Sequence, residues 1–305
     1  MSIPPSGRQY EIRYGEQLAV VVEVGGGVRE YQAGDRAVLD PYPREAMCDG
    51  AHGAVLVPWP NRLDGGRYRF DGVDYQVPIT EPEKGNAIHG LLRWCNWEAV
   101  KESSNQLTVG VRLHPQPGYP FALDVTVDYL LDDEGLTVTT TATNRGEQPC
   151  PYGCGHHPYL SPGSGLIDQA VLSFTAGTRI VTDPDRQLPT GTEPVAGSSF
   201  DFSAGRQLGD QRIDFAFTDL ARDDAGRTWV RLDGPDGRRA ELWVDNSYPL
   251  IELYTGDTLS PHRRRQGLGV EPMTCPPNAF RTGDGVARVK PGQTVTTRWG
   301  ARLHA

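Results

Sequence analysis

The chain has 305 residues and a formal net charge of −9 at pH 7, and this acidic balance argues against a nucleic-acid or anionic-membrane partner. The length allows a large core, and no apolar run approaches the roughly 20 residues that span a bilayer. The 36 glycines and 25 prolines favour many turns and short strands over helices.

The compartment and the cysteine chemistry are predicted together. The first seven residues, Met-Ser-Ile-Pro-Pro-Ser-Gly, carry neither the basic nor the hydrophobic region of a signal peptide, which predicts a cytoplasmic protein. An odd number of cysteines, five, then favours reduced thiols. Cys150 and Cys154 have three residues between them, not two, and no second pair follows, so we expect no zinc site.

From the N-terminus onward, short apolar runs alternate with turns. Residues 18–24 and 28–31 are predicted as antiparallel strands, joined by a tight turn at the glycines 25–27. A phosphate loop is disfavoured there, since no Lys-Ser/Thr pair follows. Asp71-Gly72 between the runs 66–70 and 73–77 is a strong hairpin signal.

The middle and end of the chain continue the same pattern. Apolar and polar residues alternate with period two over 123–131 and 136–143, which predicts a half-buried antiparallel pair. Two short helical turns are predicted near 43–49 and 203–208. We expect about twenty strands in one domain over 1–305, with an all-β fold that is a large antiparallel β-sandwich. Further strands are predicted at 171–174, 179–181, 228–233, 239–245, 250–254, 285–289 and 294–299.

Five charged or imidazole side chains lie at strand ends or in loops shaped by glycine and proline, where functional groups are often displayed. Proline follows Glu271 and favours extended backbone before it, so Glu271 is predicted to end a strand. Taken alone, Glu271 is either a general base or an ordinary exposed loop glutamate. The five residues are Arg62, His89, His157, Asp214 and Glu271.

The segments around these residues resemble the successive signatures of the aldose 1-epimerase (galactose mutarotase) family. They occur in the family's order over roughly residues 10–300: Val57-Pro-Trp-Pro-Asn-Arg62, Ile88-His-Gly-Leu91, His157-Pro-Tyr-Leu160, Ile213-Asp-Phe-Ala-Phe217 and Val270-Glu-Pro-Met-Thr274. The resemblance implies a β-supersandwich fold, no metal or other cofactor, and interconversion of the α and β anomers of a free sugar.

That reaction removes the proton of the C1 hydroxyl and delivers a proton to the ring oxygen, which suits a carboxylate and an imidazole. By resemblance, Glu271 is the general base, His157 the general acid, and His89 a hydrogen-bond partner of the ring oxygen or a neighbouring hydroxyl. Arg62 and Asp214 would hold sugar hydroxyls. We expect the Glu271 carboxylate and the His157 ring to face each other across a space about one sugar ring wide.

Three further residues are weighed against this set. His156 and His157 are adjacent, so on an extended segment they point to opposite sides, and only His157 is predicted to face the sugar. Tyr254 and Gln266 are predicted to line the pocket as substrate-binding residues.

The substrate stays open at this point. A neutral free hexose such as glucose or galactose is our first choice of partner. The alternatives are an anionic sugar, sulfonated or 6-phosphorylated, for which Arg263-Arg-Arg265 would supply a basic rim, and a non-catalytic sugar-binding or sensor protein on the same fold. A homodimer is compatible with the sequence, which does not fix the oligomeric state.

Overall fold

Two large antiparallel sheets form the protein, whose computed structural model describes residues 3–304. The larger sheet has the order β1-β2-β3-β4-β16-β25-β24-β21-β18-β19, with β15 paired to β25 and β5 paired to β15. Its strands are β1 (Gln9–Tyr14), β2 (Gln17–Val22), β3 (Val28–Ala33), β4 (Arg36–Leu39), β5 (Val55–Leu56), β15 (Gly155–His156), β16 (Tyr159–Leu160), β18 (Ala176–Thr182), β19 (Pro189–Pro194), β21 (Asp214–Leu220), β24 (Leu250–Tyr254) and β25 (Leu268–Met273).

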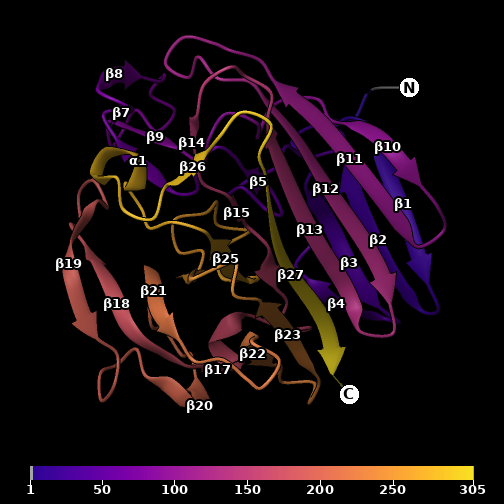
Figure 1. Cartoon of the computed structure of the whole chain (residues 1–305). Helices are drawn as coiled ribbons and strands as arrows, with labels where there is room; N and C mark the ends of the chain where they lie inside the picture. The colour runs from indigo at the N-terminus through magenta and orange to yellow at the C-terminus, as the bar shows by residue number, and fades with distance from the viewer. Residues whose placement is uncertain (1–2, 305) are drawn as a thin grey trace.

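The second sheet has the order β10-β11-β12-β13-β27-β23-β22-β17-β20. In Figure 1, β10 to β13 and β27 lie across β1 to β4, so that the two sheets form stacked layers. Its strands are β10 (Glu98–Glu102), β11 (Gln106–Leu113), β12 (Leu123–Asp132), β13 (Gly135–Asn144), β17 (Val171–Phe174), β20 (Phe202–Gln207), β22 (Thr228–Asp233), β23 (Arg239–Val244) and β27 (Thr294–His304).

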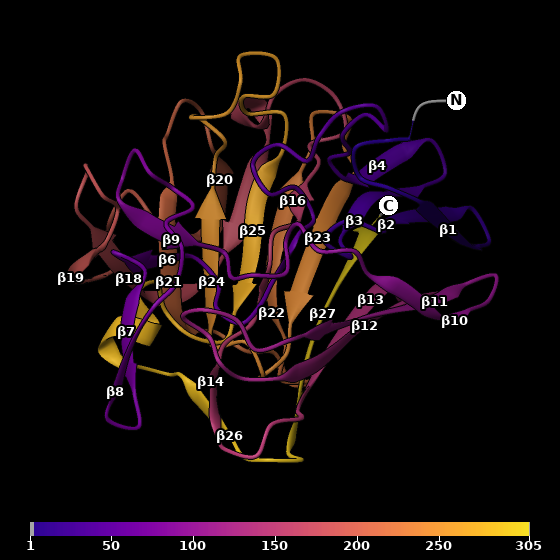
Figure 2. The same ribbon diagram turned by 90° about the horizontal axis from the view of Figure 1, so that it is seen from above.

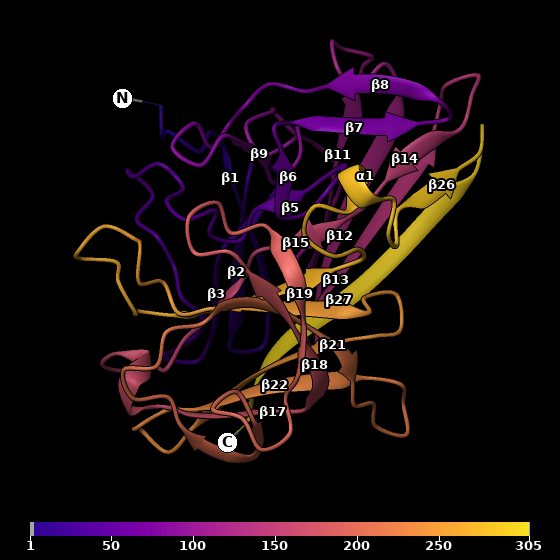
Figure 3. The same ribbon diagram turned by 90° about the vertical axis from the view of Figure 1, so that its left-hand side faces the viewer.

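Three two-stranded sheets and two very short helices complete the described chain. The pairs are β6 (Arg62–Asp64) with β9 (Asn86–Ile88), β7 (Arg67–Phe70) with β8 (Val73–Gln76), and β14 (Cys150–Tyr152) with β26 (Ala287–Val289). The helices are the single turn α1 (Ala279–Thr282) and the 3-10 turn η1 (Ile167–Gln169). Figure 3 shows β7, β8 and α1 together at one end of the molecule. No helix of residues 3–304 is long and apolar enough to cross a membrane.

Alternating side chains form the core between the two sheets. On β12, Leu123, Val125, Val127 and Tyr129 are buried while the residues between them are half-exposed. The neighbouring strand β13 shows the same period. Each such aliphatic side chain contributes about 1.5–3 kcal/mol when it is removed from water. The predicted all-β sandwich, the hairpin at Asp71-Gly72 and the long antiparallel pair are therefore confirmed.

Other local predictions are wrong. Residues 203–208 lie almost entirely in β20, and the segment 43–49 forms turns without a helix. Glu271 lies inside β25, which continues through Pro272 to Met273. A proline is tolerated there because the ladder on that side of β25 is interrupted: β16 pairs with Leu268 and Gly269, and β15 pairs only with Met273.

The centre of the larger sheet positions the functional site. Strands β24 and β25 are buried along their whole length, on both faces. One face packs against the sandwich core, and the other is covered by loops from the first third of the chain. In Figure 2, which looks down from above, the segment with β6 and β9 passes in front of this part of the sheet, near β21. Polar side chains on this covered face are therefore enclosed without lying in the sandwich core.

Candidate active site

One wall of the candidate site is the face of the larger sheet that points away from the sandwich core. Successive side chains of a strand point to opposite faces. Leu253 belongs to the core cluster, so its chain neighbours Glu252 and Tyr254 point to the other face. The same alternation on β21 and β25 completes this wall, and the side chains that line one cavity from it are Asp214, Glu252, Tyr254 and Glu271.

His157 reaches the cavity from the short connection between β15 and β16. Its backbone is fixed on both sides: the amide donates to Ala54 O at 3.1 Å, and the carbonyl accepts from Gly53 N at 2.9 Å. The neighbouring His156 points the other way, where its Nε2 lies 2.7 Å from Thr140 Oγ1 in the core. The two histidines thus face opposite sides, and only the His157 ring lines the cavity.

His89 enters from the opposite side, directly after β9. It has a left-handed backbone, with φ of +61°, and two reciprocal bonds hold it to Asn61. Its amide donates to Asn61 O at 3.0 Å, and its Nδ1 accepts from Asn61 N at 3.2 Å. Since a neutral imidazole carries one proton, acceptance at Nδ1 leaves the proton on Nε2. His89 is thereby fixed as a hydrogen-bond donor.

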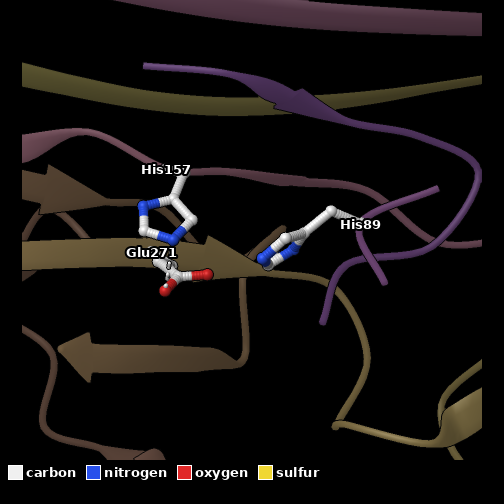
Figure 4. Close-up of side chains that lie close together, drawn as sticks. All are labelled: His89, His157 and Glu271. Atoms are coloured by element: carbon white, nitrogen blue, oxygen red, sulfur yellow. Dashed lines mark ion pairs between the residues drawn. The ribbon is translucent and has the colours of Figure 1, made fainter. Parts of the chain in front are cut away.

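The Glu271 carboxylate and the His157 ring are in direct contact. Glu271 Oε1 lies 3.0 Å from His157 Nε2, and His89 points at the pair from the far side (Figure 4). The expected separation of one sugar ring is therefore wrong. The reason lies in the strand pairing: β15 and β16 both pair with β25, so the short connection that carries His157 lies next to Glu271.

Burial sets the protonation behaviour of this pair. Loss of solvent, followed by the charges of Glu252 and Asp214, raises the pKa of Glu271 well above its ordinary value. Loss of solvent also lowers the pKa of His157 well below its ordinary value, with His52 adding to the effect. A carboxylate with a raised pKa is a stronger base, and an imidazolium with a lowered pKa is a stronger acid.

Each member of the pair also has one buried polar atom without a hydrogen bond in the described structure: Glu271 Oε2 and His157 Nδ1. Such orphaned atoms are uncommon and often mark functional sites. The free Glu271 oxygen is an acceptor in the cavity, where a ligand hydroxyl would satisfy it.

The cavity has a volume of about 290 Å³, suited to one small ligand. Arg62 lines it, held by Glu81, whose oxygens accept from Arg62 Nε at 2.9 Å and Nη2 at 3.0 Å. Asp214 also lines it, and Gln187 Nε2 donates to its Oδ2. Arg62 and Asp214, both predicted from the sequence, therefore line the same cavity as His89, His157 and Glu271.

Of the two less specific candidates, only one reaches this cavity. Tyr254 lines it, with its hydroxyl 2.6 Å from Thr258 Oγ1. Gln266 is half-buried in the turn before β25 and is not among the residues that line the cavity.

The predicted basic rim at Arg263-Arg-Arg265 is not found at the cavity either. Arg263 is paired with Asp40 at 2.7 Å and Arg265 with Asp168 at 2.5 Å. Arg264 lines a neighbouring cavity.

Four cavity or support residues were missed from the sequence: Asn61, Glu81, Arg93 and Glu252. A signal for Glu252 was present, since it lies two residues before Tyr254 on a predicted strand and must share its face. Arg93 and Glu81 stand in loops, and no local pattern gives their direction. Asn61 was named only as part of the Val57-Pro-Trp-Pro-Asn-Arg62 motif.

The donor atoms of His89, His157 and Glu271 lie within 4.8 Å of one another, close enough to raise the question of a metal ion. The hydrogen bonds of His89 answer it. Burial lowers the pKa of His89, so the ring is neutral, and Nδ1 accepts the Asn61 amide proton. Nε2 then carries the proton and has no lone pair for a metal. The three side chains suit proton transfer better than metal binding.

Comparison with known proteins identifies the family. The sequence profile of the aldose 1-epimerase family matches residues 8–300. The chain belongs to the aldose 1-epimerase family. It is therefore an isomerase of the epimerase class, with a mutarotase-type activity on a sugar.

Individual relatives are more distant. This family member is 33% identical over 279 residues to the uncharacterized protein YihR of Escherichia coli K12, covering 91% of this chain and 87% of that protein. It is 26% identical to galactose mutarotase of Mus musculus, over 81% of this chain and 77% of that protein. The structure of a GalM/aldose epimerase homologue from C. elegans superimposes with a TM-score of 0.86 at 20% identity, covering 97% of this chain and 98% of that one, and so confirms the fold.

Proposed function

We propose that this protein is a mutarotase for a free hexose such as glucose or galactose and that it works with its own side chains as acid and base. The observation that carries the proposal is the contact between Glu271 Oε1 and His157 Nε2, together with the unpartnered Glu271 Oε2 in the cavity. A base and an acid converge there on a space for one sugar. A protein that only binds a sugar needs neither.

The proposed reaction starts from the Glu271 carboxylate and the His157 imidazolium. Glu271 Oε2 takes the proton of the C1 hydroxyl while His157 Nε2 gives its proton to the ring oxygen, the C1–O bond of the ring breaks, and the open-chain aldehyde forms. Rotation about C1–C2 exposes the other carbonyl face, and the same two protons return when the ring closes. Ring opening leaves the pair uncharged, the form that burial favours.

The other cavity residues hold the sugar in this scheme. His89 Nε2–H donates to the ring oxygen or a hydroxyl next to it, and the Asp214 carboxylate accepts from a sugar hydroxyl. Arg62 Nη1 is the guanidinium nitrogen that Glu81 leaves free. These contacts hold the C1 hydroxyl and the ring oxygen in line with the base and the acid, so that binding energy is used to orient the reacting atoms.

A polarimetric assay tests the proposal. Freshly dissolved α-D-glucose or α-D-galactose should mutarotate faster with the protein, and Glu271→Gln should lower kcat by about 10²-fold or more, since it removes the base but keeps the size of the side chain. His156→Gln, beside the acid but directed into the core, is the matched control and should keep the rate. If no aldose is accelerated, the protein is a sugar binder or sensor instead.

An anionic hexose is a second candidate substrate, and Arg93 favours it. Arg93 lines the cavity, and its guanidinium lies over the Trp94 ring, 5.3 Å from the centroid, with no hydrogen bond or ion pair to any residue of 3–304. Burial lowers the pKa of Arg93, and the nearby Cys48 and Glu81 offset this effect only in part. The assay therefore includes hexoses with a sulfonate, phosphate or carboxylate at C6, and a higher kcat/KM for one of them would select this candidate.

A further inference from the structure

A third carboxyl group, Glu252, faces the cavity beside the proposed base. It lies directly opposite Glu271 in the β24–β25 ladder, and only 3% of its surface is exposed. Asp214 is its diagonal neighbour on β21, since Ala216 pairs with Glu252 and Asp214 with Tyr254. Like charges on facing strand positions repel one another, so three ionised carboxylates in one enclosed site would be costly.

The placement of Glu252 shows how the charge can be reduced. Glu252 and Asp214 are diagonal neighbours on one wall of the cavity, a spacing that long side chains can bridge, and two carboxyl groups can bond to each other only when one of them is protonated. Each has one oxygen occupied by an amide donor: Asn61 Nδ2 donates to Glu252 Oε2 at 2.7 Å, and Gln187 Nε2 donates to Asp214 Oδ2.

Burial assigns the shared proton to one partner. Glu252 is enclosed, whereas Asp214 is only half-buried, so ionisation costs more at Glu252. The charged groups that face Glu252 are Asp214 from β21, Glu271 from β25 and Arg62 from β6. Two of them are acidic, and the guanidinium is already paired with Glu81. Accordingly, burial and then the charge of Asp214 raise the pKa of Glu252 well above its ordinary value.

We propose that Glu252 is a positioning residue that stays protonated in the working enzyme and donates its proton to the Asp214 carboxylate. Asp214 is thereby fixed with its remaining lone pairs toward the sugar, and Glu252 adds no negative charge at the position facing Glu271. The roles of Asp214 and Glu271 in this inference rest on the proposed mutarotase function.

Two substitutions distinguish a protonated Glu252 from a charged one. Glu252→Gln keeps an oxygen for Asn61 and an N–H donor for Asp214 without a charge, so kcat/KM should stay within about three-fold of the wild type. Glu252→Ala leaves both partners unsatisfied and should lower kcat/KM by about ten-fold or more. A loss in Glu252→Gln as large as that in Glu271→Gln would overturn the proposal, because it would mean that the charge of Glu252 is needed.

An infrared measurement tests the proton itself and does not depend on activity. The spectrum of the wild type minus that of Glu252→Gln, both at neutral pH, should contain the carbonyl stretch of a protonated carboxylic acid. A difference spectrum with only carboxylate bands would overturn the proposal. The two failures are also separable: a wild type that accelerates no sugar refutes the mutarotase function, whereas the infrared band alone decides whether Glu252 carries the proton.

Discussion

Two arginines line the cavity, and their surroundings differ at the level of single atoms. Arg62 is held by both oxygens of Glu81, and the guanidinium in turn lowers the pKa of that carboxyl group, although burial opposes the change. A planar fork fixed in this way presents its free nitrogen in one direction. The guanidinium of Arg93 lies over the Trp94 ring and has no hydrogen bond or ion pair to any residue of 3–304. Arg62 is thus a preorganised hydrogen-bond donor. Arg93 is a cation without an ion-pair partner in residues 3–304.

This difference predicts a change of substrate preference for Arg93→Met, which keeps an unbranched apolar side chain but removes the guanidinium and its charge. A charge-assisted hydrogen bond contributes about 1.5–3 kcal/mol, so kcat/KM for a C6-anionic hexose should fall by about 10–100-fold, and that for the neutral hexose should change little. Arg264→Met is the matched control because Arg264 lines only the neighbouring cavity. If Arg93→Met lowers kcat/KM equally for both sugars, the guanidinium contacts a group that the two sugars have in common, and not the anion at C6.

At the scale of elements, the connection after β9 must pass very close to the segment after β5. A Cβ at Gly90, where φ is +71°, would lie 2.1 Å from the carbonyl oxygen of Val57. Gly72 in the β7–β8 turn also has a left-handed backbone, with φ of +82°, but no atom within 4 Å of such a Cβ. An alanine at Gly72 would therefore suffer backbone strain alone, whereas an alanine at Gly90 would suffer both backbone strain and a steric clash.

Gly72→Ala should lower the free energy of unfolding by about 1–2 kcal/mol, the cost of a left-handed alanine, and leave mutarotation unchanged. Gly90→Ala adds a clash with rigid backbone and shifts the adjoining His89, so it should destabilise the protein more and also lower kcat. Denaturant unfolding and polarimetry on both variants measure these effects. Similar losses of stability in the two variants would show that the segment at Val57 moves aside freely.

The same elements show what local sequence pattern determines. Strands 228–233 and 250–254 were predicted with the bounds of β22 and β24, because alternation and flanking turns mark them. The strand with Glu271 was predicted to stop at Pro272, since the rule for the residue before proline is local. Whether a proline breaks a strand depends on the neighbour that faces its nitrogen, and that neighbour, β15, is more than a hundred residues away in the chain.

At the scale of the whole molecule, the site is assembled from residues between Arg62 and Glu271, which strand order alone brings together. Their identity could be predicted because each lies in a segment that resembles a signature of the aldose 1-epimerase family, and all of these segments except that of Asp214 contain glycine or proline. The side chains that hold these residues in place could not be predicted. The pairing of Glu252 with Asn61 and of Arg62 with Glu81 depends on side-chain directions across separate sheets, and no period in the sequence encodes them.

The histidine that faces away from the site links the stability of the whole fold to pH. His156 is buried against Thr140 and Trp299, and burial lowers the pKa of His156 to about 3. The unfolded chain binds a proton at this residue below about pH 6.5, whereas the folded chain does not. Stability from this group is therefore complete above that pH and is lost progressively as the pH falls toward 3.

Between pH 7 and pH 5 this loss amounts to about 2 kcal/mol, since each pH unit below 6.5 costs about 1.36 kcal/mol. His156→Gln stays neutral at both pH values and retains a partner for Thr140, so its free energy of unfolding should fall by about 2 kcal/mol less than that of the wild type over this range. His114→Gln is the control, because His114 is exposed and its ring is already solvated in the folded chain. Denaturant unfolding at both pH values measures the difference. An equal decline in His156→Gln and the wild type would mean that His156 takes up its proton without unfolding, and the sandwich would then have to admit water between β13 and β27.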